Sequence, residues 1–350
     1  MISYVPYSDD LEVEQPDEQS KIADILRYLG IAHERAIAAR RHAPGETHAK
    51  GHGVLKGTFT VEPELPEELA QSLFAAPGTY PAVLRFATEA GTLMDDREPA
   101  ARGLAMKLIG VDGEKMAADG RLTQDFLCNN CPILPLAEVT TYREIARLRA
   151  EYGHDPAQLA AEIAKRDDAD VQTLFERLPN IDLLAHSYYS QSAFRYGDYV
   201  CKYALMPNTE AQRALAARPV TDDDRPDVLS EWLAEFLADN DAGFDFCIQL
   251  LTDPETMPIE DASVEWDVGK SAWRRVGTLS LPAQNPFTPA RRAFGDEVLG
   301  FDPWAGRPDL RPLGSINRVR KPAYRASSRR RHEYNDRAGF EPISIGDVPD

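Results

Sequence analysis

The stretch Ser187–Met206 reads SYYSQSAFRYGDYVCKYALM and gives the clearest indication of the fold. Tyr, Phe and Val, which favour strands, recur throughout it. Gly197-Asp198 interrupts the run with residues typical of a tight hairpin turn. The stretch therefore predicts two antiparallel strands joined by a short turn.

Further extended segments lie on both sides of this hairpin. Short apolar or alternating runs predict strands at Gly53–Val61, Tyr80–Ala87, Gly103–Ile109, Asp125–Cys128, Phe244–Leu251 and Val276–Leu281. Apolar residues at helical spacing predict helices at Gln19–Arg41, Leu136–Ala150, Pro156–Ala164, Val171–Leu178 and Asp227–Asp239. Strands grouped in blocks, with helices between the blocks, favour an α+β fold over an alternating α/β fold.

The sequence predicts a single folded domain. The beginning of the chain is rich in Asp, Glu and Pro, which predicts a loose tail over residues 1–16. Between residues 17 and 340 no Gly/Ser-rich linker, internal repeat or low-complexity tract marks a boundary. We therefore expect one domain over residues 17–340. The chain has 350 residues and 43% hydrophobic content, enough to bury a sizeable core.

Charge and cysteine content narrow the classes of partner and location. The 57 acidic and 39 basic residues give a net charge of −18, which disfavours binding to nucleic acid or to an anionic membrane surface. No apolar stretch is long enough to span a bilayer, and no secretory signal is visible. The four scattered cysteines are too few for a disulfide scaffold. We expect reduced, mostly buried thiols in a cytoplasmic protein.

A tyrosine surrounded by arginines lies near the C-terminus, in Ser315–His332 (SINRVRKPAYRASSRRRH). Tyr324 follows Arg320 at i+4 and precedes Arg329 and Arg331. A nearby guanidinium stabilises the ionised phenol and lowers its pKa. Tyrosinate is one of the axial ligands that haem iron takes in proteins. The alternative is an Arg-rich surface helix in which Tyr324 merely packs.

Three other polar residues stand at the ends of predicted strands. His48 comes before the first strand, Arg85 lies at the end of the second, and Asn130 follows the fourth. Each also has a purely structural interpretation, as a turn histidine, a solvated arginine and a turn asparagine. The functional alternatives are a general acid–base or metal ligand for His48 and a substrate-binding amide for Asn130.

In chain order, five short motifs resemble the landmarks of the haem catalases. They are His48-Ala-Lys-Gly, Arg85-Phe-x-Thr, Arg102-Gly-x-Ala-x-Lys, Asn129-Asn-x-Pro and Arg320-x-x-x-Tyr. The two late predicted strands, followed by Gln-Asn-Pro, are also similar to that family. Because the chain is shorter than ordinary catalases, it resembles most closely the minimal catalase-related branch, which includes organic peroxidases and allene oxide synthases.

This resemblance implies an antiparallel β-barrel core of the catalase type with surrounding helices, and haem b as the cofactor. It implies that His48 is the distal base and that Asn130 is a distal amide donor that steadies the peroxide. Tyr324 would be the proximal iron ligand, with Arg320 holding it ionised. The His can accept a proton from one peroxide oxygen and return it to the other.

The resemblance also implies how the rest of the haem is held. Arg85 and Arg331 would neutralise the propionates, with Arg329 supporting them. Catalases have Ser where this chain has Ala87, and Thr88 is the expected substitute hydrogen-bonding group.

Two further departures concern the surroundings of the distal and proximal residues. Catalases have an Arg where this chain has Gly45, so Arg40 or Arg41 is a candidate replacement. Pro322 lies between Arg320 and Tyr324, and proline is tolerated in a first helical turn. The helix is therefore expected to begin close to Pro322.

The activity implied by these residues is peroxide reduction. We expect a haem-dependent peroxidase that uses hydrogen peroxide or an organic hydroperoxide and a small organic donor, with weak catalase activity. One alternative is a fatty-acid hydroperoxide isomerase similar to allene oxide synthases. The others are a non-catalytic haem-binding or sensing protein and a catalase-fold scaffold that has lost haem. A homodimer is the expected assembly.

Overall fold

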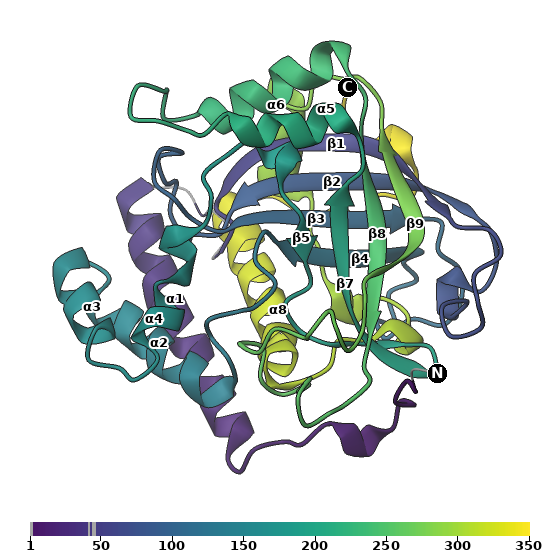
Figure 1. Ribbon diagram of the computed structural model, residues 1–350. Coiled ribbons are helices and arrows are strands. Elements are labelled where there is room, and N and C mark those ends of the chain that lie inside the picture. Colours follow the sequence, from purple (N-terminus) through teal and green to yellow (C-terminus); the bar gives the residue numbers. More distant parts are fainter. Residues whose placement is uncertain (1–2, 41–42, 44–46) are drawn as a thin grey trace.

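A closed antiparallel sheet forms the centre of the computed structural model, which describes residues 3–40, 43 and 47–350 (Figure 1). The strands are β1 (Lys50–Val61), β2 (Thr79–Thr88), β3 (Arg102–Ile109), β4 (Thr123–Asn129), β5 (Tyr188–Tyr189), β6 (Phe194–Tyr196), β7 (Tyr199–Pro207), β8 (Ala242–Leu250) and β9 (Arg274–Leu281). They follow the order β5-β4-β3-β2-β1-β9-β8-β7-β6, and β5 also pairs with β7, which closes a barrel. The predicted α+β fold with an antiparallel barrel is confirmed.

Helices cover the barrel in two groups. They are α1 (Glu18–Arg40), α2 (Val139–Tyr152), α3 (Pro156–Ile163), α4 (Ala169–Gln172), α5 (Glu210–Ala214), α6 (Val228–Asp239), α7 (Pro289–Ala293) and α8 (Ser315–Asn335). In Figure 1, α1–α4 lie on one side of the barrel and α5 and α6 lie over one end. The helix α8 packs against α1 and α2 and lies between them and the barrel in this view.

Local sequence signals placed most of these elements correctly. The predicted hairpin turn is present, because Gly197 between β6 and β7 has a φ of 60°, a conformation that glycine adopts without strain. The predicted helix over Val171–Leu178 is instead divided into the short α4 and a 3₁₀ turn at Leu174–Arg177.

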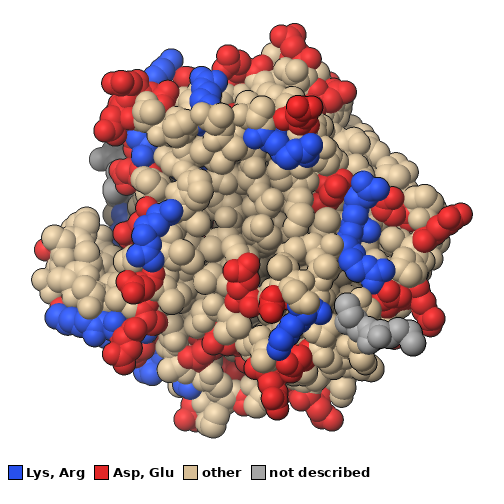
Figure 2. Space-filling view, viewed as in Figure 1, with Lys and Arg blue, Asp and Glu red and all other residues tan. Residues whose placement is uncertain are grey.

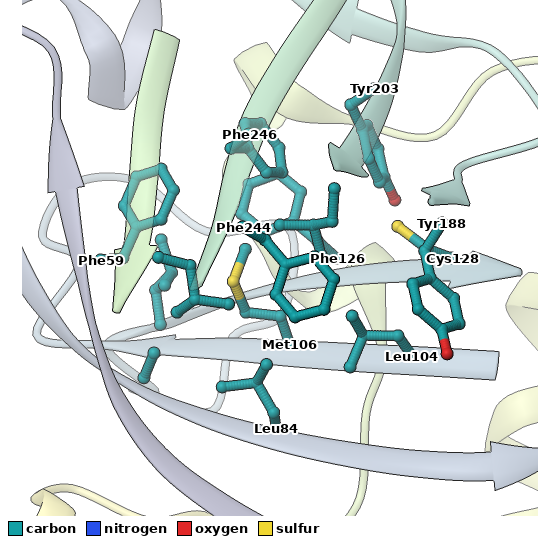
Figure 3. Close-up of a cluster of buried hydrophobic side chains, with 14 of the residues drawn as sticks. Phe59, Leu84, Leu104, Met106, Phe126, Cys128, Tyr188, Tyr203, Phe244 and Phe246 are labelled. Atoms are coloured by element: carbon teal, nitrogen blue, oxygen red, sulfur yellow. The ribbon is translucent and has the colours of Figure 1, made fainter. Parts of the chain in front are cut away.

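Aromatic side chains fill the inside of the barrel (Figure 3). Phe126 and Phe246 meet edge to face with ring centroids 4.9 Å apart, and Phe246 also stacks on Tyr203. Side chains alternate between the two faces of a strand, so the residues between these core positions point outward. A cofactor-sized cavity therefore has to lie outside the barrel wall.

The helix α8 begins at Ser315 and contains Pro322 in its interior, so the prediction of a helix start near Pro322 is wrong. Pro322 cannot donate a backbone hydrogen bond within the helix. Tertiary contacts compensate, because Val319 is fully buried and the Arg318 guanidinium forms ion pairs with Glu18 and Glu260. As a result, Arg320 and Tyr324 are one helical turn apart on the same helix.

The expected loose tail over residues 1–16 is fixed to the barrel where the structure describes it. Val5 N donates to Leu251 O at 2.9 Å, and Tyr7 N donates to Asp198 O at 2.7 Å. Val13 N donates to Glu260 Oε1 at 2.9 Å. The tail is therefore part of the folded body, whereas the single domain over residues 17–340 stays a prediction.

The face of the molecule in Figure 2 carries both acidic and basic side chains. On the face in Figure 2, Asp and Glu side chains gather around the edge, and the described Lys and Arg side chains are scattered over it. Within the residues that the structure describes, no helix is long and apolar enough to cross a membrane.

A buried ion pair joins the barrel to the C-terminal segment. Lys107 Nζ lies 2.8 Å from Asp125 Oδ1 and 2.8 Å from Glu341 Oε1, and the Lys107 side chain is fully buried. Replacing Lys107 by Met is expected to lower the free energy of unfolding by about 3–5 kcal/mol, because it leaves a buried carboxylate without its partner. Urea unfolding measures this loss.

The matched control is Lys165→Met, which breaks an exposed pair with Glu162. An exposed pair contributes little, so this variant should unfold at nearly the parental urea concentration. Equal stability of the Lys107 and Lys165 variants would contradict the structural role of the buried pair.

Candidate active site

A cavity of about 960 Å³ lies between the outer face of the barrel and α8. Its volume is in the range of pockets for cofactors and small molecules. The barrel contributes outward-facing residues of three neighbouring strands, and α8 contributes Arg320 and Tyr324. The strand residues are Arg85, Ala87, Gly103, Ala105, Leu127 and Asn129. The cavity thus gathers residues that are far apart in the sequence.

His48 borders this cavity, as its predicted role requires. Its backbone has a φ of 55°, and its carbonyl oxygen accepts hydrogen bonds from both terminal nitrogens of Arg85 at 3.2 Å. A Cβ on Gly103 would stand 2.5 Å from His48 Nδ1, so the ring lies directly over this glycine. Burial, and then the positive charges of Arg85 and Arg320, lower the pKa of His48 to about 3. The imidazole is therefore neutral at neutral pH and able to accept a proton.

The structure places Asn129, not Asn130, in the cavity, which corrects the prediction for the Asn pair. Asn130 Oδ1 accepts from Arg102 N at 2.8 Å, and its Nδ2 lies 3.5 Å from His186 Nδ1. The Asn130 amide therefore makes its contacts within the protein and does not line the cavity. The alternation along β4 could have identified Asn129, because Phe126 and Cys128 face the core and the residues between them face outward.

Thr88 also lies away from the cavity, so the prediction that it supports haem or His48 is wrong. Its hydroxyl contacts His52 Nε2 at 2.8 Å and accepts from Arg102 Nη1 at 2.5 Å. Thr88 is fully buried on the face of β2 opposite to Arg85 and Ala87. Ala87 lines the cavity without offering a side-chain hydrogen bond.

Tyr324 and Arg320 both line the cavity from α8. Burial raises the pKa of Tyr324, and the opposing effect of Arg320 is smaller, so the expected lowering of this pKa is wrong for the metal-free protein. The Arg320 guanidinium donates to Ser192 Oγ and Asn317 Oδ1, each at 3.3 Å. A metal ion at Tyr324 would have to displace the phenolic proton.

Two arginines at the edge of the cavity, Arg85 and Arg331, both contact Asp296. Arg85 Nη2 lies 3.0 Å from Asp296 Oδ1, and Arg331 Nη1 donates to Asp296 O at 3.1 Å. Burial, and then the charge of Arg85, lower the pKa of Arg331. Arg331 Nε is buried and has no hydrogen-bond partner among the described residues. Arg329 also borders the cavity, with an exposed side chain.

The proposed replacements for the missing catalase arginine cannot be placed. Arg41 and Gly45 lie outside the described residues, as does the side chain of Arg40.

Of the comparisons with known proteins, the one with solved structures identifies the fold. No family model and no curated protein matches the sequence. A fungal catalase superposes with a TM-score of 0.55 and 15% identity, and the match covers 90% of this chain and 67% of that chain. A bacterial catalase superposes with a TM-score of 0.57 and 16% identity, and the match covers 87% of this chain and 60% of that chain. Catalase A from Saccharomyces cerevisiae superposes with a TM-score of 0.53 and 15% identity, and the match covers 86% of this chain and 62% of that chain.

The chain has the catalase fold. The resemblance seen in the sequence is thereby confirmed at the level of the fold, and the minimal catalase-related branch stays a prediction. The chain spans only 60% and 62% of the bacterial and yeast catalases.

Glu89 is among the charged residues of the cavity that the sequence reasoning missed. Glu89 follows β2 and lines the cavity beside Asn129. Its Oε2 accepts a hydrogen bond from Asn129 Nδ2 at 2.8 Å. Burial raises the pKa of the Glu89 carboxyl to about 7. The only sequence signal for Glu89 is its position directly after the Arg-Phe-x-Thr motif.

The residues of the cavity fit a haem group. Tyr324 supplies a phenol oxygen of the kind that binds haem iron. Arg85 and Arg331, with the unpartnered Arg331 Nε, supply cationic donors suited to carboxylate groups such as propionates.

Proposed function

We propose that this protein is a haem-dependent peroxidase of the catalase superfamily. It reduces hydrogen peroxide or an organic hydroperoxide and oxidises a small organic donor. The observation that carries the proposal is one cavity that joins His48 on the barrel side with Tyr324 and Arg320 on α8. A protein that only stores or carries haem has no need for a neutral, partly buried histidine at this place.

Haem b, when bound through Tyr324, would supply an iron that takes up the oxidising equivalents of the peroxide. His48 accepts the proton of one peroxide oxygen and returns it to the other, which leaves as water or an alcohol. Two electrons and two protons from the donor complete the reduction. Arg85 and Arg331 would hold the carboxylate groups of the cofactor.

The organic donor, the balance of peroxidase and catalase activity, and haem b itself are parts of this proposal. The cytoplasmic location and the homodimer also stay predictions from the sequence.

The test is to add peroxide and then a phenolic donor to the haem-loaded protein in a stopped-flow spectrophotometer. We expect the Soret band to shift within seconds and to return when the donor is added, with two electron equivalents of donor consumed per peroxide and one alcohol formed per organic hydroperoxide. A Soret band that does not respond to peroxide would overturn the proposal. Donor-independent conversion of a polyunsaturated fatty-acid hydroperoxide to an epoxide or ketol would instead identify an isomerase.

A further inference from the structure

The nitrogen of the Asn129 amide already has two protein acceptors. Asn129 Nδ2 donates to Glu89 Oε2 at 2.8 Å and to Gln191 Oε1 at 3.1 Å. Gln191 is itself fixed, because its Nε2 donates to Ile133 O at 2.7 Å and its side chain is 1% exposed. Since a primary amide has two N–H groups, both are used within the protein.

The oxygen of the same amide is free and faces His48. Asn129 Oδ1 is buried and has no hydrogen-bond partner among the described residues. It stands 3.1 Å from the point that a Cβ on Gly103 would occupy, and His48 Nδ1 stands 2.5 Å from the same point. The Asn129 carbonyl and the imidazole therefore flank Gly103 at one end of the cavity.

Glu89 and Gln191 together fix which end of the Asn129 amide points toward His48. An ionised carboxylate can only accept hydrogen bonds, so the amide nitrogen has to face Glu89. The pKa of Glu89 is raised to about 7 by burial, against the lowering effect of Arg149 and then Arg320. Above this pH the carboxylate form predominates, and the amide orientation is fixed.

We propose that Glu89 is a positioning residue that makes the cavity prefer hydrogen peroxide to alkyl hydroperoxides. With Asn129 Oδ1 and the unprotonated nitrogen of neutral His48, the site offers two acceptors. Hydrogen peroxide has two O–H groups and satisfies both, whereas an alkyl hydroperoxide has one and leaves an acceptor unpaired. A buried acceptor left unpaired is unfavourable. This inference rests on the proposed peroxidase function and deepens it.

The test compares hydrogen peroxide with tert-butyl hydroperoxide at pH 8, using the rate of the Soret change in the haem-loaded protein. The parent should favour hydrogen peroxide. Glu89→Leu should reduce that preference about tenfold, the effect of roughly one hydrogen bond, because the Asn129 amide loses one of the two acceptors that hold it. Glu89→Gln should keep the preference, since its side-chain oxygen can still accept from Asn129 while Gln191 keeps the amide nitrogen on that side. Glu89→Ala is the second variant if the Leu variant does not fold.

A measurement without haem checks the same hydrogen bond. In the full-length haem-free protein labelled with ¹⁵N-asparagine, the Asn129 side-chain N–H signals should exchange slowly in the parent and in Glu89→Gln. They should exchange fast in Glu89→Leu. An Asn129→Asp variant identifies these signals.

The outcomes separate the inference from the proposed function. A parent and a Glu89→Leu variant with the same peroxide preference, or the same Asn129 exchange, would overturn the role of Glu89 and leave the peroxidase intact. A parent that reacts with neither peroxide would overturn both. A reduced preference together with faster Asn129 exchange supports the role of Glu89.

Discussion

Replacing Tyr324 by Phe is expected to weaken haem binding by more than about 100-fold. Tyr324 is the phenol that α8 presents to the cavity, and the substitution removes only its hydroxyl oxygen. Loss of groups that merely orient a metal ligand costs about 10–100-fold in affinity, so loss of the ligand itself should cost more. Titration of the haem-free protein with haem, followed at the Soret band, measures the change.

The matched control is Tyr334→Phe on the same helix. The Tyr334 side chain is exposed, so its hydroxyl should have no effect on haem affinity or on the spectrum. A Tyr324→Phe protein that binds haem with parental affinity and an unchanged ferric spectrum would show that the proximal ligand has been assigned to the wrong residue.

Replacing His48 by Ala should slow the reaction with peroxide by about 10²–10⁴-fold, the usual contribution of a general acid–base. Haem binding should persist, because the cofactor contacts of Tyr324 and the arginines are unchanged. The pKa of His48, lowered to about 3, leaves the ring neutral above that pH. Protonation of His48 should therefore cause no loss of rate between pH 5 and pH 8. Stopped-flow measurements over this pH range provide both results.

The control for the histidine is His154→Ala, at an exposed position next to α2. This variant should react at the parental rate. A His48→Ala protein that reacts as fast as the parent would mean that His48 is not the proton acceptor.

Gly103→Ala tests the position of the same ring without deleting it. The added Cβ would stand 2.5 Å from His48 Nδ1, too close for a carbon, so the imidazole has to move. The rate with peroxide should fall in the same direction as in His48→Ala, while haem binding is kept. Ala105→Gly, at the next outward position of β3, is the control and should change the rate little. A parental rate in Gly103→Ala would show that the ring position is not required.

Features that depend on neighbouring residues were predictable from the sequence. The Gly197 turn and the apolar alternation of the flanking strands are local signals, and they located the hairpin. Closure of the barrel depends on the pairing of β5 with both β4 and β7, which no local pattern shows. The closed barrel was predicted only through the resemblance to catalases, which rests on five short motifs in chain order.

The details of the site depended on which face of a strand each residue occupies and on burial. Asn129 and Asn130 are adjacent in the sequence, but the Asn129 amide lies in the cavity and the Asn130 amide is bound within the protein by Arg102. Thr88 points inward for the same reason. The direction of the Tyr324 pKa follows from burial, which outweighs Arg320 and has no signature in the sequence. Pro322 gave a wrong helix start because α8 begins about two turns earlier, where ion pairs of Arg318 with Glu18 and Glu260 anchor it.

The most direct test of a haem centre held by Tyr324 is the absorption spectrum of the purified ferric protein after addition of one equivalent of haem. The proposed function predicts binding of one haem per chain with a high-spin spectrum typical of a tyrosinate ligand. A spectrum identical to that of free haem, or to that of the Tyr324→Phe protein, would contradict the account.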